Sequence, residues 1–298
     1  MMARVAQVGT ASILRVEESA GPLFTPDGLL PDFAPEIVDR HRDWLVPAHF
    51  HLERRLLVMS IHSFVIRTGR HTILVDTCCG NHKDRSFAPG FKAFHRRQTN
   101  WLERLIGAGV APDEVDWVMC THLHVDHVGW NTRLRDGRWV PTFPKAKYLF
   151  ARREFDYWNP DNGAEEAKRD APIFEDSVRP VAEAGQMVLV DDGYQLDDVM
   201  TIREAPGHTP GTIFGQLRSQ GQAAVFSGDM MHHPLQIYRP DWSSRFCSDP
   251  RRSAESRSRL LGSICDSDTI LLPAHFSAPH GGRVRGAKGG GFRFEWLA

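Results

Sequence analysis

Three histidines and an aspartate fall within six consecutive positions of this 298-residue chain. They are His122, His124, Asp126 and His127, and they directly follow the short, largely apolar run 115–120. Neutral imidazole and carboxylate are the ligands that borderline divalent ions such as zinc prefer. Gathering them without a cation would cost hydrogen-bonding and desolvation energy. The density of these residues therefore predicts a metal site.

Three further candidate ligands lie downstream, each just beyond an apolar run of strand length. They are His208 in an Ala-Pro-Gly-His sequence, Asp229 in Ser-Gly-Asp and His275 in Pro-Ala-His. If these runs are strands, their trailing loops can converge at one edge, because strand ends aim the side chains that loops carry. The sequence thus predicts one site built from four separate loops.

This pattern resembles the metallo-β-lactamase superfamily, whose HxHxDH signature is matched by residues 122–127. The ordered GH, GD and AH sequences that end at 208, 229 and 275 extend the resemblance over roughly residues 56 to 276. The resemblance implies an α/β fold, an αββα sandwich of two mixed β-sheets with helices on the outer faces. It also implies a metal-dependent hydrolase.

The resemblance further implies seven ligands for two divalent ions. One ion would be held by His122, His124 and His208, the other by Asp126, His127 and His275, with Asp229 bridging them. A carboxylate suits the bridge because its two oxygens can serve two cations and reduce their repulsion. Zinc is the default ion, and Mn²⁺, Fe²⁺ or Co²⁺ also suit a mixed Asp/His site.

Two ions that share a water lower its pKa toward neutrality and supply a hydroxide nucleophile, so no Ser or Cys nucleophile is needed. Related binuclear hydrolases imply that Asp126 carries the proton to the leaving group. Ligating imidazoles commonly donate their free N–H to a carboxylate. Asp76, at the end of the run 71–77, is the candidate for that support, and the alternative is an aspartate that caps the following turn.

Within the superfamily, residues 227–234 and 247–250 look most like the branch of acyl-homoserine lactonases and methyl-parathion-type hydrolases. We therefore expect attack of the bridging hydroxide on a lactone, either an N-acyl-homoserine lactone or a similar cyclic ester. Where the best-known lactonases place a tyrosine three residues beyond the bridging aspartate, this chain has His232. His232 or His233 could donate to the substrate carbonyl instead, or either could simply pack beside the metals.

Two other hydrolase functions use the same ligands. A phosphotriesterase or arylesterase is the first alternative, and a glyoxalase-II-like thioesterase is the second. The thioesterase should carry a late basic cluster, for which Arg283, Arg285 and Lys288 are the candidates. A non-enzymatic metal or redox partner would need a further module or a CxxC pair, which the sequence lacks.

The surrounding sequence predicts the elements that position these residues. Strands are expected at 4–16, 56–76 and 147–150, and helices at 91–106, 152–158, 163–184 (interrupted at Pro172 and Pro180) and from Pro250 onward. Residues 1–298 are expected to form a single domain, in which the proline-rich segment 21–50 is an ordered loop that covers the pocket or builds an interface. The tail 281–291 reads as loop.

Several aromatic residues lie near the candidate ligand loops in sequence. Trp130, Trp158, Tyr238 and Trp242 would line the substrate pocket or, as aromatics more often do, pack in the core. The remaining histidines have no ligand spacing and are expected to be structural or exposed; they are His41, His49, His51, His62, His71, His82, His95 and His280.

Composition narrows the classes of partner. The formal net charge is −1 with scattered basic residues, which argues against nucleic acid. No signal sequence or membrane-length apolar run is seen, so we expect a cytoplasmic protein without a membrane partner. Five cysteines, including the adjacent Cys78 and Cys79, are expected to be reduced. The expected partners are a small-molecule ester or lactone and, by the resemblance to lactonases, a second copy in a homodimer.

Overall fold

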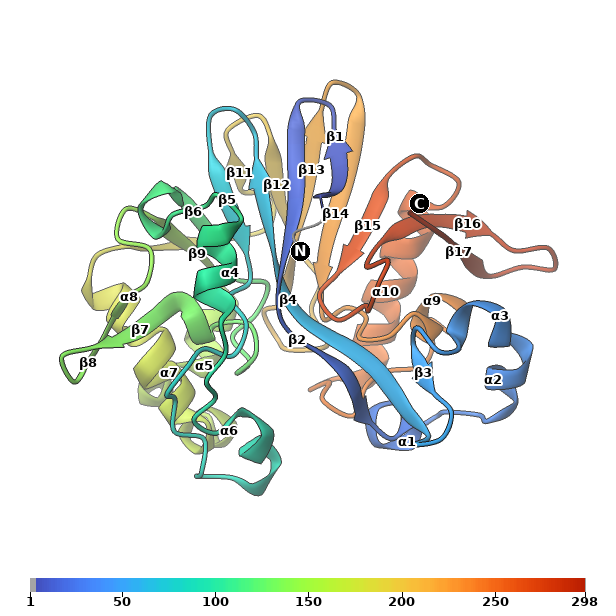
Figure 1. Cartoon of the computed structure of the whole chain (residues 1–298), viewed down its shortest axis with the longest axis horizontal. Helices are drawn as coiled ribbons and strands as arrows, with labels where there is room; N and C mark the ends of the chain where they lie inside the picture. The colour runs from blue at the N-terminus through green and yellow to red at the C-terminus, as the bar shows by residue number, and fades with distance from the viewer. Residues whose placement is uncertain (1–3, 298) are drawn as a thin grey trace. The chain divides into compact units, whose positions relative to one another are not determined.

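The computed structural model describes residues 4–297, which form two compact units (Figure 1). The first unit comprises the residues up to Glu18 and the stretch His62–Tyr194. The second comprises Ser19–Ile61 and the residues from Gln195 onward. Strands β2 and β4 contribute residues to both. The single-domain organisation of residues 1–298 remains a prediction.

The first sheet is mixed. Its strand order is β1-β2-β4-β5-β6-β9-β10, with β3 beside β4. The strands are β1 (Arg4–Val8), β2 (Ala11–Phe24), β3 (Phe50–His51), β4 (Leu56–Arg67), β5 (Thr72–Val75), β6 (Trp117–Met119), β9 (Lys147–Ala151) and β10 (Met187–Val190). The pairs β5/β6, β6/β9 and β9/β10 are parallel. The continuous apolar runs of β5, β6 and β9 match strands that are buried on both faces.

The first unit also contains short helices and one small hairpin. They are the 3₁₀ helix Pro89–Phe94, α4 (Trp101–Gly107), the 3₁₀ helices Pro112–Glu114, Gly129–Asn131 and Pro160–Asn162, α5 (Arg152–Trp158), α6 (Glu165–Arg169), α7 (Ala171–Ser177), α8 (Arg179–Glu183) and the strands β7 (Thr132–Arg135) and β8 (Arg138–Pro141). Helix α5 and the interrupted helical region 163–184 confirm the predictions. Pro172 and Pro180 each stand in the first turn of a new helix, where the missing N–H is not needed.

The helix predicted over 91–106 is only partly correct. Residues 95–100 have no helical structure, and α4 begins at Trp101. Phe91 and Phe94, which suggested a longer helix, lie in the preceding 3₁₀ helix, where their rings are 6.4 Å apart and the Phe87 ring lies 5.2 Å from that of Phe91. Their spacing therefore reflects a local aromatic cluster.

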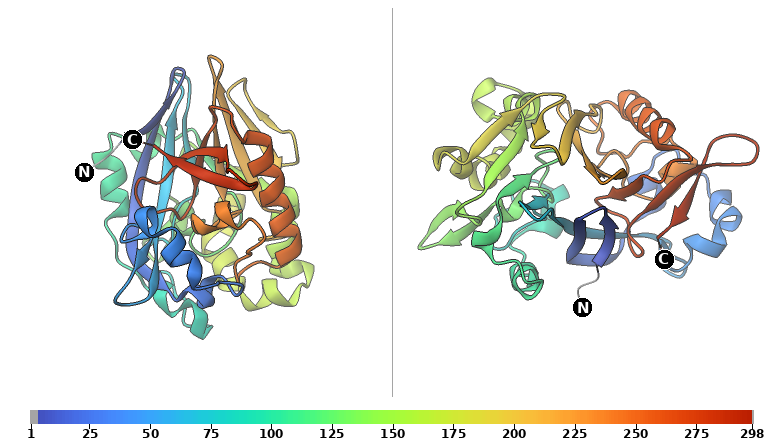
Figure 2. Two further views of the ribbon diagram at one scale, coloured as in Figure 1. Left: turned by 90° about the vertical axis from the view of Figure 1, so that its right-hand side faces the viewer. Right: turned by 90° about the horizontal axis from the view of Figure 1, so that it is seen from above.

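The second sheet lies entirely in the second unit, in the order β11 to β17. Its strands are β11 (Gln195–Leu196), β12 (Met200–Glu204), β13 (Ile213–Ser219), β14 (Gln222–Gly228), β15 (Ile270–Pro273), β16 (Gly282–Gly286) and β17 (Phe292–Trp296). Only β14/β15 among these pairs is parallel. The chain between β14 and β15 contains helix α10 (Pro250–Ile264), which runs alongside the sheet (Figures 1 and 2).

Helix α10 begins where the sequence predicted. The Asp249 side chain accepts a hydrogen bond from the backbone N–H of Arg252, and Pro250 occupies the first turn. This cap satisfies a donor that the helix itself leaves unpaired. Leu261 and Ile264 then pack into a core with residues of β14 and β15.

The proline-rich segment 21–50 was expected to be an ordered loop, and the structure places short helices in it; its role as a pocket cover or an interface stays a prediction. It contains the end of β2 and the short helices α1 (Pro26–Leu29), α2 (Glu36–Arg40) and α3 (Arg42–Leu45). Its residues Leu29, Leu45 and Phe50 share a buried core with Trp242. The segment is thus an integral part of the second unit.

The loop predicted for 281–291 is wrong in its first half, because residues Gly282–Gly286 form β16 and pair with β17. A Cβ on Gly282 would lie 2.4 Å from the Glu295 carbonyl oxygen, so glycine permits the close approach of the two strands. Glycine content here indicates tight pairing, which composition alone cannot distinguish from a loop.

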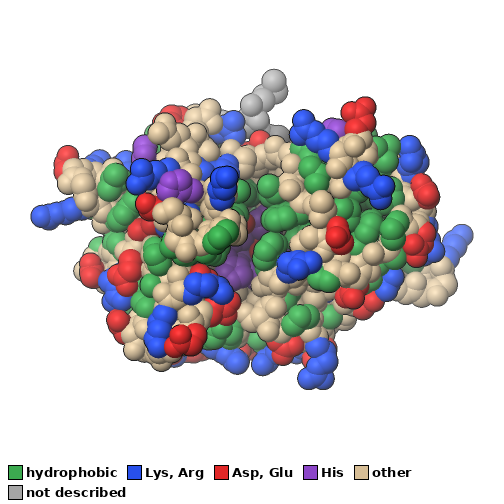
Figure 3. Space-filling model, turned by 90° about the horizontal axis from the view of Figure 1, so that it is seen from below, with side chains coloured by type: hydrophobic (Ala, Val, Ile, Leu, Met, Phe, Trp, Pro, Cys, Tyr) green, Lys and Arg blue, Asp and Glu red, His purple; other side chains and the backbone are tan. Residues whose placement is uncertain are grey.

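The remaining observations concern the cysteines, the length of the helices and the charged side chains. Cys78, Cys79 and Cys120 are buried free thiols, and burial raises the pKa of each. Within residues 4–297, no helix combines the length and apolar character needed to cross a membrane. Figure 3 shows basic and acidic side chains interspersed over the face that it draws.

Candidate metal centre

The first unit carries four of the predicted ligands on the turn after β6; we call His122, His124, Asp126 and His127 the first donor set. His122 and His127 are buried, and their rings lie 4.0 Å apart. The rings of His122 and His124 lie 4.6 Å apart. Ligand atoms of Asp126 and His127 lie within 4.8 Å of each other. The structure therefore brings all four side chains together.

Asp76 supports the first donor set from the end of β5. Its Oδ2 lies 2.9 Å from His127 Nδ1, and its Oδ1 accepts a 2.7 Å hydrogen bond from the Thr121 backbone N–H. The Thr121 hydroxyl contacts the same carboxylate and, at 3.1 Å, His122 Nδ1. Since Nδ1 of His127 donates to Asp76, its Nε2 carries the lone pair that a cation requires.

A second carboxylate, Glu154 of α5, holds the same turn from another side. Its Oε1 accepts hydrogen bonds from the Leu123 backbone N–H at 3.0 Å and from Trp158 Nε1 at 2.7 Å. Trp158 in turn packs edge-on against His124, with 5.4 Å between the rings. Glu154 is 1 % exposed, which is unusual for glutamate and fits a carboxylate that accepts hydrogen bonds from buried donors.

Backbone packing fixes the far end of the turn. Gly129 donates its N–H to the Cys78 carbonyl at 2.7 Å, and a Cβ at Gly129 would lie 1.9 Å from the Cys79 carbonyl. Buried Glu18 accepts from the backbone N–H groups of Cys79 and Gly80 and, at 2.8 Å, from Trp130 Nε1. Only glycine fits at position 129 in this packing, because a Cβ there would overlap the Cys79 carbonyl.

The second unit carries the other three predicted ligands; we call His208, Asp229 and His275 the second donor set. Asp229, at the end of β14, lies at its centre. Its Oδ2 is 3.3 Å from His208 Nε2, and its Oδ1 is 3.0 Å from His275 Nε2. A fourth ring joins them, because His232 Nε2 lies 3.2 Å from the same Oδ2. All four residues are buried.

The protonation pattern of the second donor set fits a cation. His275 Nδ1 lies 3.0 Å from the Ser60 carbonyl oxygen, to which only an N–H can donate. Its Nε2 then carries a lone pair in the neutral ring and faces Asp229 Oδ1 at 3.0 Å. Two electron-rich atoms at this distance repel each other unless a cation or proton lies between them. The donor set is thus chemically suited to divalent metal.

The segment 243–248 lines the second donor set. Ser244 Oγ lies 3.3 Å from His232 Nε2, and Cys247 Sγ lies 3.7 Å from His208 Nδ1. The Ser248 backbone N–H donates to the His208 carbonyl at 2.9 Å. This segment therefore fixes the positions of two imidazoles.

The two adjacent histidines of the second unit differ in their surroundings. His232 faces Asp229, and burial lowers its pKa, which favours the neutral ring. His233 faces away, since its Nε2 donates to the His49 carbonyl at 2.9 Å and its Nδ1 accepts from the Leu235 N–H at 3.3 Å. With both nitrogens of His233 engaged, His232 is the better candidate for contact with a substrate.

The predicted pocket aromatics are largely core residues. Trp130, Trp158 and Trp242 are at most 5 % exposed, and Tyr238 is half-buried. Sequence reasoning missed Glu18 and Glu154. Glu18 has a signal, because it lies on the buried face of the alternating strand β2. Glu154 sits on a short helix whose sequence gives no comparable sign.

Comparison with known proteins identifies relatives of this chain. The family model of the metallo-beta-lactamase superfamily matches residues 57–275. Metallo-beta-lactamase domain-containing protein 1 of Xenopus laevis is 28% identical over 221 residues, covering 72% of this chain and 70% of that protein. The N-acyl homoserine lactonase AttM of Azorhizobium caulinodans is 34% identical over 120 residues, covering 39% of this chain and 41% of the lactonase.

Solved structures share the fold. The hydrolase AbOPH of the beta lactamase superfamily superposes with a TM-score of 0.80 at 22% identity, covering 98% of this chain and 96% of that one. AidC, a dizinc quorum-quenching lactonase in complex with a product N-hexanoyl-homoserine, gives a TM-score of 0.76 at 19% identity, covering 100% and 97%. At these identities the likeness establishes the two mixed sheets with helices as a shared fold.

Proposed function

This chain belongs to the metallo-β-lactamase superfamily, and from that membership we propose that it is a binuclear metal-dependent hydrolase that opens a lactone ring. The proposed substrate is an N-acyl-homoserine lactone or a similar cyclic ester. The observation that carries the proposal is the arrangement of imidazole nitrogens around Asp229. Similarity to proteins named as lactonases supports the choice of a lactone among the esters of this superfamily.

We propose the following assignment of ligands. In this assignment His122, His124 and His208 would hold one ion, Asp126, His127 and His275 would hold the other, and the Asp229 carboxylate would serve both. Two such ions, zinc by default, would supply a Lewis acid for the carbonyl oxygen and a hydroxide nucleophile near neutral pH. The protein's own contribution is orientation, because ligands held by a surrounding shell of hydrogen bonds keep one geometry.

Residues beyond the ligands have distinct proposed roles. Asp76 and the Ser60 carbonyl orient His127 and His275 by accepting their Nδ1 protons. Asp126 is partly exposed, whereas His127 is buried, so Asp126 is the ligand best placed to exchange protons with a substrate. It would carry a proton to the ring oxygen that leaves. His232, neutral and able to donate one N–H, would assist the carbonyl oxygen or hold Asp229.

The proposal is tested by measuring kcat/KM for opening an N-acyl-homoserine lactone, followed by proton release. A paraoxon-like triester is assayed beside it with the same metal-loaded enzyme. Fast lactone opening with slow triester cleavage supports the proposal. The reverse assigns the protein to the phosphotriesterase or arylesterase alternative. A glutathione thioester is assayed as a third substrate, and its turnover alone assigns the protein to the thioesterase alternative.

Substitution of Asp229 tests the metal assignment. Asp229→Asn should lose much of one metal equivalent and most activity, because a neutral amide cannot bridge two cations. Asp268→Asn is the matched control in the same unit, since the Asp268 side chain is 97% exposed. Metal content is measured by mass spectrometry after gel filtration. Full occupancy and normal rates in Asp229→Asn contradict the binuclear assignment.

A further inference from the structure

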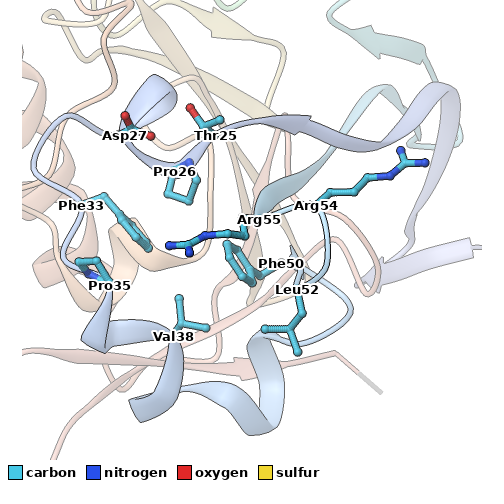
Figure 4. A pocket seen from close by; sticks show the side chains of 10 residues that line it. All are labelled: Thr25, Pro26, Asp27, Phe33, Pro35, Val38, Phe50, Leu52, Arg54 and Arg55. Carbon is cyan, nitrogen blue, oxygen red and sulfur yellow. The ribbon is translucent and has the colours of Figure 1, made fainter.

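The second unit contains a pocket that uses none of the proposed metal ligands. It has a volume of about 640 Å³, within the ~300–1,000 Å³ typical of ligand pockets. Figure 4 shows the residues that line it: Thr25, Pro26, Asp27, Phe33, Pro35, Val38, Phe50, Leu52, Arg54 and Arg55. They come from the proline-rich segment and from the turn between β3 and β4.

The walls of this pocket are mainly apolar. Phe33, Val38, Phe50 and Leu52 present aromatic and aliphatic surface (Figure 4). Leu52 is 38% exposed and is among the large apolar side chains that face solvent in the described part of the chain. A concave apolar surface that is open to water favours a ligand with a hydrocarbon portion, because binding removes the apolar surface of both the pocket and the ligand from water.

One cation lies across this apolar surface. Figure 4 shows the Arg55 side chain extending over the pocket toward Phe33, whereas Arg54 points away. Among residues 4–297, no carboxylate forms an ion pair with the Arg55 guanidinium. Arg55 has φ of +54°, a left-handed backbone that is uncommon outside glycine and that turns this side chain off the strand path. A guanidinium binds carboxylate through two parallel N–H donors.

We propose that this pocket binds an anionic amphiphile, namely an unbranched fatty carboxylate. The hydrocarbon chain would pack on Phe33, Val38 and Phe50, and the carboxylate would accept hydrogen bonds from Arg55. Arg55 is the guanidinium that reaches over the apolar surface, and it has no ion-pair partner among residues 4–297, so a carboxylate is expected to bind there. This inference does not depend on the proposed lactonase activity, because no lining residue belongs to either donor set.

The pocket wall is fixed by contacts that make it a formed site. Arg245 donates from its backbone N–H to the Leu29 carbonyl at 2.9 Å, and from its side chain to the carbonyls of Gly28 and Asp27 at 3.1 and 3.2 Å. Phe33 packs on Trp242, with 6.0 Å between the rings. A preformed wall reduces the conformational entropy that binding would otherwise cost.

The test is calorimetric titration of the full-length protein, treated with EDTA, with dodecanoate below its critical micelle concentration. Removing metal separates this pocket from carboxylate binding at a metal centre. We expect saturable binding at one site, at least tenfold tighter than that of dodecyltrimethylammonium, which has the same chain and the opposite charge. Equal binding of the two amphiphiles, or no saturable binding, overturns the proposal.

Two substitutions locate the site. Arg55→Asn should weaken dodecanoate binding about tenfold, and asparagine tolerates the left-handed backbone at this position. Arg54→Asn is the matched control, because the neighbouring Arg54 side chain points away from the pocket. Val38→Trp should block binding by filling the pocket. Unchanged affinity in both Arg55→Asn and Val38→Trp, with circular dichroism confirming folding, overturns the assignment to this pocket.

Discussion

Buried His233 should make the protein less stable in mild acid. Burial lowers the pKa of His233 to about 4 from the 6.5 of an exposed histidine. Both ring nitrogens are engaged, and protonation of Nδ1 would place a second N–H against the Leu235 N–H. The folded state therefore resists a proton that the unfolded state accepts. Stability is fully present above pH 6.5 and is lost as pH falls toward 4.

The size of the effect follows from the shift. At about 1.36 kcal/mol per pKa unit, a drop from 6.5 to about 4 corresponds to a loss of about 3 kcal/mol between these pH values. The substitution His233→Gln removes the titration and retains an N–H donor for the His49 carbonyl. The variant should be less stable by about 1–2 kcal/mol at pH 8, because one buried hydrogen bond changes. Its stability should then fall less steeply below pH 6.5.

The assay is urea unfolding followed by tryptophan fluorescence at pH 8 to 4, with EDTA present for both proteins so that metal release is common to them. The difference in unfolding free energy between His233→Gln and wild type should shift by about 3 kcal/mol in favour of the variant across this range. Above pH 7.5 the two curves should run parallel, which is the internal control. Parallel curves down to pH 4 would refute the reasoning.

Three further substitutions test the supports of the donor sets. Gly129→Ala should prevent native packing of the turn that carries the first donor set, because the new Cβ would lie 1.9 Å from the Cys79 carbonyl. Faster proteolysis and weaker zinc binding in a titration would confirm this. Glu154→Ala should destabilise the protein by about 3 kcal/mol and weaken zinc binding, because it leaves the buried Trp158 N–H unpaired. Urea unfolding measures the stability and zinc competition measures the affinity. An unchanged zinc affinity contradicts the positioning role of Glu154. Arg257→Met tests the backbone beside Asp229, because the buried Arg257 donates to the carbonyls of Met230 at 2.6 Å, Pro240 at 2.6 Å and Trp242 at 3.0 Å. Loss of these hydrogen bonds should cost about 3 kcal/mol, and a loss below about 1 kcal/mol in thermal unfolding contradicts this.

The ligand-bearing loops were predictable because their signals are local. His122 to His127 form one motif, and Asp249-Pro250 gives a helix start that the structure confirms. The supports were less predictable because their partners are distant in sequence. Glu18 contacts Trp130 across 112 positions and Glu154 contacts Leu123 across 31. No local pattern encodes such a pairing, so the sequence indicated the candidate ligands but carried little information about what orients them.

The same contrast explains the errors in the predicted elements. Residues 91–100 have apolar spacing that suits a helix, but contacts among Phe87, Phe91 and Phe94 satisfy it in another way. The glycine-rich tail resembles a loop until strand pairing is known. In both places tertiary contacts override local propensity.

The segment 243–248 has a consequence for thermodynamic linkage. Arg245, in the middle of this segment, is hydrogen-bonded to the wall of the pocket described above, and Ser244 and Cys247, on either side of it, contact His232 and His208. A ligand that displaces this segment would therefore move the His232 and His208 imidazoles and change the free energy of metal binding. Linkage is reciprocal, so any factor by which an amphiphile alters metal affinity is the factor by which metal alters amphiphile affinity. The metal state of the second donor set would then be readable as a change in affinity at the pocket.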